Sequence, residues 1–353
     1  MDPHIKTILA RLIKENFDGF IVFSPANISY LCGFTSHDAY LLISNSQNIY
    51  FTDSRYLEEV KKYLNRKFIR KNIGDSFVKT LAASVNELGL KRLGFEARHI
   101  TYDGYRKLRS ALGKRLDLIP ADFFIEELRQ KKDRVELGKI RHAAQITLGA
   151  LDYARRITKP GIKEIEVAAE LERFIRIHGA TSAAFDMIVA SGPNSSFPHH
   201  QTGQRKIKNN EPVLIDIGVD YLGYKSDLTR IFFLGKISFS ARRIYDIVAQ
   251  AQFRALKIIK PGVLIKEIDA SARRFISEKG LGRCFTHNLG HGVGREVHEA
   301  PRISPREKTK LEKGMVFTLE PAIYLPNKFG IRIEDMVLVT EKGADLISGT
   351  LDK

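Results

Sequence analysis

The feature that most constrains this chain is an internal repeat in its second half. Residues 158–179 (TKPGIKEIEVAAELERFIRIHG) and 259–280 (IKPGVLIKEIDASARRFISEKG) match at a constant offset of 101, and they share Lys-Pro-Gly, Arg-Phe-Ile and a closing Gly. Each copy is a Pro-Gly break, a helix and then a strand-rich segment. The repeat favours a duplicated α+β unit with pseudo-twofold symmetry and a ligand site between its halves. Chance similarity between two amphipathic helices is the alternative.

The first 125 or so residues have a different pattern, in which short apolar runs alternate with helical stretches. This pattern indicates an α/β domain, with strands expected at 19–24, 39–44, 49–52 and 92–97 and helices at 54–64, 77–89 and 102–112. A long charged amphipathic stretch then runs from about Phe124 to a stop at Lys159-Pro160-Gly161. We expect an N-terminal α/β domain at 1–126 and a C-terminal α+β domain at 127–353.

Composition excludes several classes of protein. With 353 residues, 43% of them hydrophobic and 28% charged, the chain is not typical of collagen-like, disordered or disulfide-scaffold proteins. Segment 1–20 predicts an amphipathic helix rather than a signal sequence, and no apolar run reaches the roughly 18 residues of a membrane span. Cys32 and Cys284 lie far apart without metal-finger spacing. We expect a cytoplasmic protein with no membrane partner.

The net charge of +16 suggests a nucleic-acid partner at first. The excess divides evenly, however, with +8 in residues 1–150 and +8 in 151–353. The densest patch is KKYLNRKFIRK at 61–71, which has six basic and no acidic residues and is a candidate phosphate-binding face. A solvated surface is the interpretation we favour, and we expect no specific nucleic acid.

Two acidic residues, Asp216 and Asp227, lie in apolar strand-like segments on either side of a Gly-containing turn. A hairpin centred between Tyr221 and Leu222 would place the two carboxylates directly opposite each other. Like charges in a cross-strand pair are destabilising, so another group must offset the repulsion.

The same arrangement recurs near the C-terminus, where Glu320 and Glu334 are related by a hairpin centred on Asn327. Buried carboxylates are costly unless they are paired, and two divalent cations would balance four of them. The alternative is that some of these acids pair with nearby basic residues, namely Lys225, Arg230 or Arg332.

Five of the ten histidines lie in two short segments, and each segment follows one copy of the repeat helix. His199 and His200 end the first segment, ASGPNSSFPHH, and the second, THNLGHGVGREVHEAP, contains His287, His291 and His298. A single histidine is more often a surface or core residue. Two such segments together predict an active site.

These acids and histidines together resemble the pattern of a known family. The ordered set Asp216, Asp227, His291, Glu320 and Glu334 resembles the ligand set of the pita-bread dinuclear metallopeptidases, which include methionine aminopeptidase, aminopeptidase P and prolidase. The resemblance implies that all five residues bind two divalent metal ions, with Asp227 and Glu334 as bridges. Manganese is the expected metal because carboxylates suit hard cations, and cobalt or zinc would also fit. Creatinase shares the fold without these ligands and is disfavoured.

The resemblance extends to the N-terminal region. NISYLCGFT (27–35), YFTDSRYLEE (50–59) and GFEARHIT (94–101) are similar to the N-terminal domain of aminopeptidase P and prolidase. This implies action on the Xaa-Pro bonds of proline-containing peptides, by a homodimer. SHDAYLLI (36–43) is slightly more similar to aminopeptidase P, so we predict an Xaa-Pro aminopeptidase that releases an N-terminal residue. An Xaa-Pro dipeptidase (prolidase) is the alternative.

The family also suggests roles for the other residues. By resemblance, Glu320 transfers a proton, and His199 and His298 position the substrate carbonyl and stabilise the oxyanion. His287 would lie beside the proline ring. Arg332 would bind substrate, with a salt bridge to the carboxylates as its alternative role. A non-catalytic binding module for nucleic acid or basic proteins is a possibility from another class, which the complete ligand set disfavours.

Overall fold

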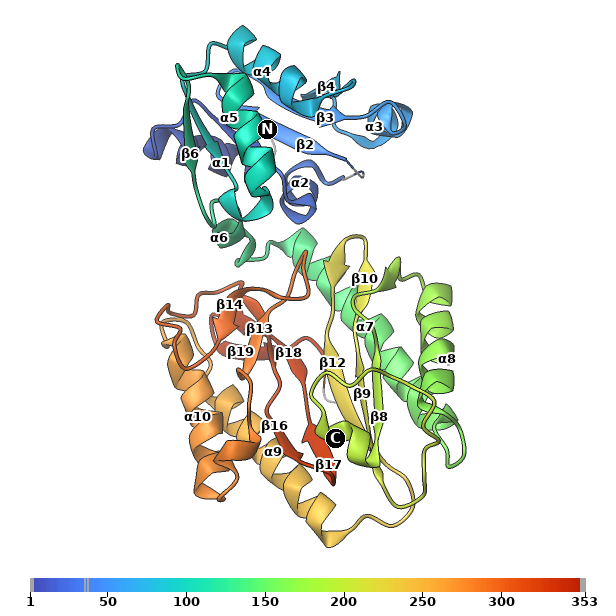
Figure 1. Ribbon diagram of the computed structural model, residues 1–353. Helices are drawn as coiled ribbons and strands as arrows, with labels where there is room; N and C mark the ends of the chain where they lie inside the picture. The colour runs from blue at the N-terminus through green and yellow to red at the C-terminus, as the bar shows by residue number, and fades with distance from the viewer. Residues whose placement is uncertain (1–2, 35, 37, 350–353) are drawn as a thin grey trace. The chain divides into compact units, whose positions relative to one another are not determined.

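The computed structural model describes residues 3–34, 36 and 38–349, and the chain divides into two units, residues 1–128 and 129–353 (Figure 1). Thr35 and His37 belong to the segments 27–35 and 36–43, which resemble aminopeptidase P, and they lie outside the described residues.

The first unit contains a six-stranded sheet with the order β4-β3-β2-β1-β5-β6. Strands β1 and β3 each pair antiparallel with β2, and the remaining pairs are parallel. The strands are β1 Gly19–Val22, β2 Tyr40–Ser44, β3 Asn48–Thr52, β4 Phe68–Asn72, β5 Arg92–Phe95 and β6 Asp117–Pro120. The four predicted strands are confirmed. The sequence did not predict β4 and β6, because these edge strands (FIRKN and DLIP) are short and partly charged.

Helices pack on both faces of this sheet, which is why its central strands are apolar throughout. Phe20 and Val22 contribute to a core that includes residues of α1 and α2, whereas Ile21 lies in a second core with residues of α4 and α5. The helices are α1 Pro3–Lys14, α2 Pro25–Cys32, α3 Leu57–Tyr63, α4 Phe77–Glu87 and α5 Tyr102–Leu112, with a 3₁₀ turn η1 at Ala97–His99. The α/β prediction for this region is confirmed.

The long amphipathic stretch that begins near Phe124 is not a single helix. Helix α6 spans Glu126–Arg129, and α7 begins after a break and spans Arg134–Ile157. The Asp133 side chain accepts hydrogen bonds from the N–H groups of Val135 and Glu136, and the Glu136 carboxylate accepts one from the Asp133 N–H. This capping box fixes the start of α7 and explains the break.

The second unit confirms the internal repeat. Helices α8 (Glu164–Ile177) and α10 (Ile265–Glu278) both have 14 residues and begin 101 residues apart. Each follows a long helix, α7 in the first copy and α9 (Phe239–Lys257) in the second, and the two helix pairs flank the strands between them (Figure 1). The turns before α8 and α10 also match, because the Gly161 N–H donates to Ile207 O and the Gly262 N–H donates to Leu311 O, both at 2.8 Å.

The strands of this unit form two three-stranded sheets, β12-β9-β8 and β11-β10-β7, a five-stranded sheet β14-β13-β15-β18-β19, and the pair β16-β17. In the first half they are β7 Ser182–Ala183, β8 Ile188–Ser191, β9 Pro212–Ile217, β10 Val219–Tyr221, β11 Tyr224–Lys225 and β12 Leu228–Phe233, with η2 at Gly192–Ser196. In the second half they are β13 Gly290–Gly292, β14 Glu299–Ile303, β15 Val316–Leu319, β16 Ala322–Leu325, β17 Phe329–Arg332, β18 Asp335–Thr340 and β19 Gly343–Leu346, with η3 at Gly282–Cys284.

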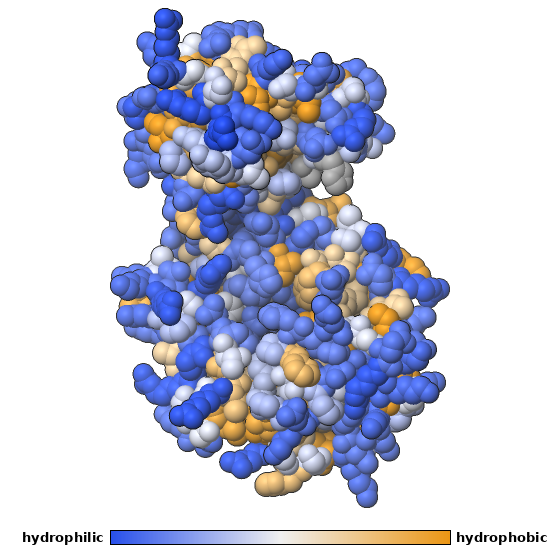
Figure 2. Space-filling view, in the orientation of Figure 1, coloured by the Kyte–Doolittle hydropathy of each residue, from blue (hydrophilic) through white to orange (hydrophobic). Residues whose placement is uncertain are grey.

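Hydrophilic residues cover most of the surface visible in Figure 2, and hydrophobic residues appear there as separate small patches. The apolar side chains of the strands and helices are therefore mostly enclosed within the units. Among the described residues, no helix combines the length and the hydropathy that a membrane crossing requires.

Candidate active site

Asp216 lies in β9, and Asp227 comes directly before β12, as expected. The two residues are not directly opposite, because the β9–β12 register pairs Asp216 with Thr229. The prediction was wrong by two residues in register, since the turn is formed by Leu222 and Gly223, which have φ angles of 50° and 79°. Such a turn needs two left-handed residues, and the glycine supplies the second without strain. The two aspartates are therefore diagonal neighbours.

The C-terminal hairpin has the predicted register. The strand pairs β15–β18 and β16–β17 share one alignment centred on Asn327, and Glu320 and Glu334 lie at the break between these two pairs. Glu334 also joins this hairpin to the first one. Its N–H donates to Thr229 O at 3.2 Å, and the Thr229 hydroxyl donates to Glu334 Oε2 at 2.7 Å.

His291 is held in β13 by close backbone packing. A Cβ atom on Gly290 would lie 1.9 Å from Thr318 O, and one on Gly292 would lie 2.2 Å from Ala300 O. Glycine is therefore required on both sides of the histidine. His291 Nδ1 lies 3.2 Å from the Gly292 carbonyl and donates to it, so Nε2 is left without a proton. Nε2 lies 3.5 Å from Asp227 Oδ2 and 3.4 Å from Glu320 Oε1.

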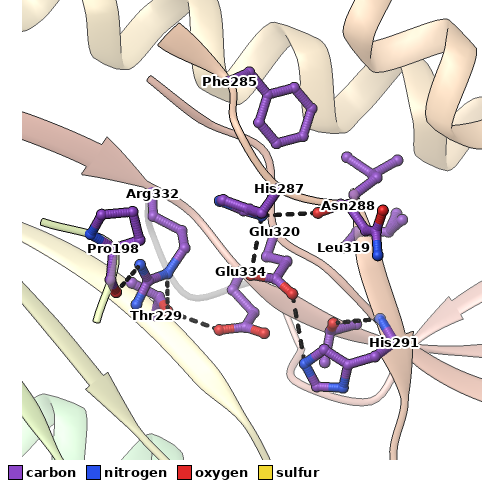
Figure 3. Close-up of polar contacts among 12 residues, drawn as sticks. Pro198, Thr229, Phe285, His287, Asn288, His291, Leu319, Glu320, Arg332 and Glu334 are labelled. Atoms are coloured by element: carbon purple, nitrogen blue, oxygen red, sulfur yellow. Dashed lines mark hydrogen bonds and ion pairs between the residues drawn. The ribbon is translucent and has the colours of Figure 1, made fainter. Parts of the chain in front are cut away.

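The structure brings the five predicted metal ligands together. Donor atoms lie within 4.8 Å of one another in three overlapping groups: Asp216, Asp227 and Glu334; His291, Glu320 and Glu334; and Asp227, His291 and His298. Figure 3 shows His291, Glu320 and Glu334 pointing toward one another, His291 from β13 and the two glutamates from the breaks after β15 and β17. Asp216 also forms a buried ion pair with Arg332, which is one of the basic residues that the sequence offered as alternative partners for the acids.

The electrostatics of this cluster show an excess of negative charge. Burial, and then the carboxylate of Glu334, raise the pKa of both Asp227 and Glu320 well above the ordinary range. Burial and Asp216 raise the pKa of Glu334 to about 8. Arg332 lowers each of these pKa values, but it does not offset the combined effect of burial and repulsion.

Two further observations show that the cluster fits metal ions. Asp216 Oδ1 is buried and has no hydrogen-bond partner among the described residues, which is the state expected of an oxygen reserved for a ligand. Burial, and then the neighbouring His298, lower the pKa of His291 to about 3, so the ring is neutral and can act as a ligand. Four carboxylates and one imidazole are a suitable donor set for divalent cations.

His287 and Arg332 belong to one chain of polar contacts. Arg332 Nη1 donates to the Tyr324 hydroxyl at 2.8 Å, and this hydroxyl lies 3.2 Å from His287 Nε2. His287 Nδ1 contacts the Asn288 carbonyl at 2.8 Å and lies 3.8 Å from Glu320 Oε2. Burial lowers the pKa of His287 to about 4. The histidine is thus neutral and faces the carboxylate cluster (Figure 3).

Most of the Arg332 donors are already used by the protein. The side chain donates to Asp216, to the Thr229 hydroxyl at 3.1 Å and to the Pro198 carbonyl at 3.1 Å, in addition to Tyr324. These contacts favour the supporting role that the sequence offered as the alternative to substrate binding.

His298 and His199 complete the group of histidines. The ring of His298 lies 4.2 Å from that of His291, measured between centroids. Desolvation and then His199 lower the pKa of His298, and His199 also contributes to the lowered pKa of His287. The His199 side chain is exposed, on the loop between η2 and β9. The loop therefore brings His199 near the other two histidines.

Comparison with known proteins agrees with this geometry. Residues 138–341 match metallopeptidase family M24, and residues 4–131 match the creatinase/prolidase N-terminal domain. The chain belongs to metallopeptidase family M24. Its expected family and its fold, a creatinase-type α/β domain followed by a pita-bread catalytic domain, are confirmed. This M24 chain is a metal-dependent hydrolase rather than a binding module that has lost catalysis.

Several relatives of this M24 peptidase match almost its whole length. An uncharacterised peptidase of Bacillus subtilis is 41% identical over 326 residues and covers 92% of each chain. The structure of an Xaa-Pro dipeptidase from Bacillus anthracis is 37% identical with a TM-score of 0.95, and that of an X-Pro aminopeptidase from Thermotoga maritima is 36% identical with a TM-score of 0.91. Both comparisons cover 99% of this chain and 98% of the other.

Sequence reasoning missed two residues that support the M24 site, Thr229 and Tyr324, and named a third, Arg230, only as a possible partner of the acids. Thr229 lies two residues after Asp227, so the period of a strand was a signal that it faces the same side. Tyr324 bridges Arg332 and His287. Arg230 donates to the carbonyl of Glu334 and to the carboxylate of Asp335, so it fixes the backbone at a ligand position. For Tyr324, no local pattern distinguished a site residue from an ordinary strand residue.

Proposed function

We propose that this M24 peptidase is an Xaa-Pro aminopeptidase, which hydrolyses the bond before a proline and releases the N-terminal residue of a peptide. The observation that carries the proposal is the convergence of four carboxylates and His291, among which Asp216 Oδ1 is buried with no hydrogen-bond partner in the described part of the chain. The relatives named Xaa-Pro dipeptidase and X-Pro aminopeptidase support the choice of bond.

Asp216, Asp227, His291, Glu320 and Glu334 would hold two divalent cations, and Asp227 and Glu334 each belong to two of the three donor groups. Manganese is our proposed metal, with cobalt and zinc as alternatives. Cations bound there would lower the pKa of a water molecule and polarise the scissile carbonyl.

The remaining chemistry belongs to protein side chains. The Glu320 side chain is 17% exposed, compared with 11% for Asp216 and 6% for Asp227, so Glu320 is the better placed of these acids to pass a proton to the leaving nitrogen. His199 and His298 would donate hydrogen bonds to the substrate carbonyl as its oxygen gains negative charge. His287, which packs edge-on against Phe285, would lie beside the proline ring.

Comparison of peptide substrates tests the proposal. The metal-loaded protein should cleave an Xaa-Pro-Yaa tripeptide but not its Xaa-Ala-Yaa counterpart, and a chelator should abolish the cleavage. Cleavage of an Xaa-Pro dipeptide alone would instead indicate the second candidate, an Xaa-Pro dipeptidase, which the name of the Bacillus anthracis relative favours. Failure to cleave any of these peptides would refute both.

We also propose that the protein forms a homodimer and has no specific nucleic-acid partner. Several basic side chains of the 61–71 patch already bind other groups of the same chain. Lys61 pairs with Glu58, Lys71 pairs with Glu87, and Arg70 donates to the Leu64 carbonyl. Sedimentation in the presence and absence of duplex DNA tests both statements, since a monomer or a DNA complex would contradict them.

A further inference from the structure

Glu164 is a fully buried carboxylate that lies outside the metal-ligand cluster. It is the first residue of α8 and has 0% exposure. Its Oε1 accepts hydrogen bonds from the Ser191 N–H at 2.7 Å and the Ser191 hydroxyl at 2.6 Å, and its Oε2 lies 2.9 Å from His200 Nε2. The Asn194 amide nitrogen lies 3.1 Å from both oxygens. All four donor groups belong to the segment 191–200.

The other side of this segment is attached to the C-terminal hairpin. The Gly330 N–H donates to the Ser195 hydroxyl at 2.8 Å, and Arg332 donates to the Pro198 carbonyl at 3.1 Å. A Cβ atom on Gly330 would lie 2.0 Å from Ser195 O, so the two backbones are in direct contact. The segment is therefore held between α8 and β17.

His199 occupies the position between these two attachments. The preceding residue, Pro198, is bound by Arg332, and the following residue, His200, is bound by Glu164. With both chain neighbours fixed, the backbone of His199 has little freedom to move, although its own side chain is exposed.

The second copy of the repeat shows that the fold does not need an acid at the start of this helix. The residue equivalent to Glu164, 101 positions later, is Ile265, the first residue of α10 and also 0% exposed. A buried carboxylate is costly unless it is satisfied, so an acid at this position has to be explained by the groups that it binds.

We propose that Glu164 is a positioning residue that holds His199 in place for the reaction. This inference rests on the proposed function, because it acts through the hydrogen bond that His199 makes to the substrate carbonyl. A misplacement of about 1 Å in an active site can cost on the order of 100-fold in rate. Glu164 would therefore affect turnover without touching substrate or metal.

Glu164→Gln tests the proposal, with Glu172→Gln on the exposed face of the same helix as the matched control. The glutamine keeps the size of the side chain but turns an NH₂ group toward at least one of the donors, so the segment should loosen. We expect kcat for an Xaa-Pro peptide to fall roughly 10- to 100-fold, with unchanged metal content, and the control to match the wild type.

A second substitution separates positioning from general damage. In a His199→Ala background, Glu164→Gln should reduce kcat by less than about threefold, because the group that it positions is already absent. An equal fold-loss in both backgrounds, or a wild-type kcat in Glu164→Gln, would overturn the proposal. If Glu164→Gln does not fold, Asn194→Ala removes one donor to the same carboxylate and should show the same dependence on His199.

Hydrogen exchange separates failure of this inference from failure of the proposed function. Exchange of the amides in 191–197 should become faster in Glu164→Gln but not in Glu172→Gln, and this measurement does not depend on the substrate. Unchanged exchange would refute the positioning role. Faster exchange in a protein whose wild type cleaves no Xaa-Pro peptide would support the anchor and refute only the assigned reaction.

Discussion

The two halves of the catalytic unit hold their histidine segments by different means. In the first half, Glu164 of α8 accepts hydrogen bonds directly from segment 191–200, mainly from side chains. In the second half, Asp269 of α10 holds Arg273, and Arg273 donates to the carbonyls of Phe285 and His287 at 3.1 and 2.8 Å. Both acids are fully buried.

The difference shows which segment depends on its own sequence. An arginine that binds backbone carbonyls needs no particular side chain in the segment that it holds. A carboxylate needs donors, and three of the four donor groups around Glu164 are side chains. The first segment therefore requires Ser191, Asn194 and His200, whereas the second is fixed mainly through its backbone.

The largest effect should come from removing one acid of the donor group to which both halves contribute. Asp227 of the first half and Glu334 of the second belong to the same group of donor atoms, so Asp227→Ala and Glu334→Ala should each abolish metal binding and peptidase activity. Metal analysis and turnover of an Xaa-Pro peptide measure the two effects. Full turnover by Asp227→Ala would show that the dinuclear mechanism is wrong.

The second largest effect should come from the anchor in the second half. Arg273→Met leaves Asp269 buried without its cation, and we expect a loss of about 3 kcal/mol in the free energy of unfolding. Arg274→Met, at the exposed neighbouring position, should change stability little. Urea denaturation measures the free energy of unfolding of both variants. Equal values would show that Arg273 does not anchor the second histidine segment.

The pH dependence of stability tests the charge state of the buried acids in the metal-ligand cluster. In the metal-free protein the pKa of Glu334 is about 8, compared with an ordinary value of 4.5, so the native state keeps a proton that the unfolded state releases. The metal-free protein should therefore lose stability as the pH rises from about 4.5 to about 8. Melting temperatures across this range should show the decline, and Glu334→Gln should make it smaller. A flat profile in the metal-free wild type would contradict the expectation.

The smallest effect should come from the link between the two halves. Tyr324 connects Arg332, which binds Pro198 of the first half, to His287 of the second. Tyr324→Phe removes this hydroxyl, and we expect kcat to fall about tenfold, as for the loss of one hydrogen bond to a charged group. Tyr153→Phe removes a hydroxyl on α7 that binds Glu170 and should have no effect on turnover. Similar kinetics in the two variants would refute a role for the link.

Much of the fold and the cluster could be predicted from the sequence because the signals were local or repeated. The Pro-Gly breaks fixed the starts of α8 and α10, and the symmetry around Asn327 gave the register of the C-terminal hairpin correctly. The first hairpin was misaligned because the positions of the two turn residues were not recognised. The capping box at Asp133 and Glu136 was a readable signal for the break before α7, and it was overlooked.

The supporting contacts could not be predicted for a physical reason. Glu164 looks like an ordinary acid in the first turn of a helix, where a negative charge is favourable in any protein. Only the tertiary fold brings Ser191, Asn194 and His200 onto it. The same holds for Arg332, whose four protein acceptors come from positions between 198 and 324.

The tight packing of Gly290 and Gly292 has a consequence for exchange of one metal for another. The strand that carries His291 lies against neighbouring carbonyl groups with no room for even one added carbon atom. The histidine nitrogen is thus a fixed point, and ions of different radius have to be accommodated by rotation of the carboxylates around it. We therefore expect substitutions of the residues that contact the acids to alter the preference among metal ions more readily than substitutions in the strand that carries the histidine.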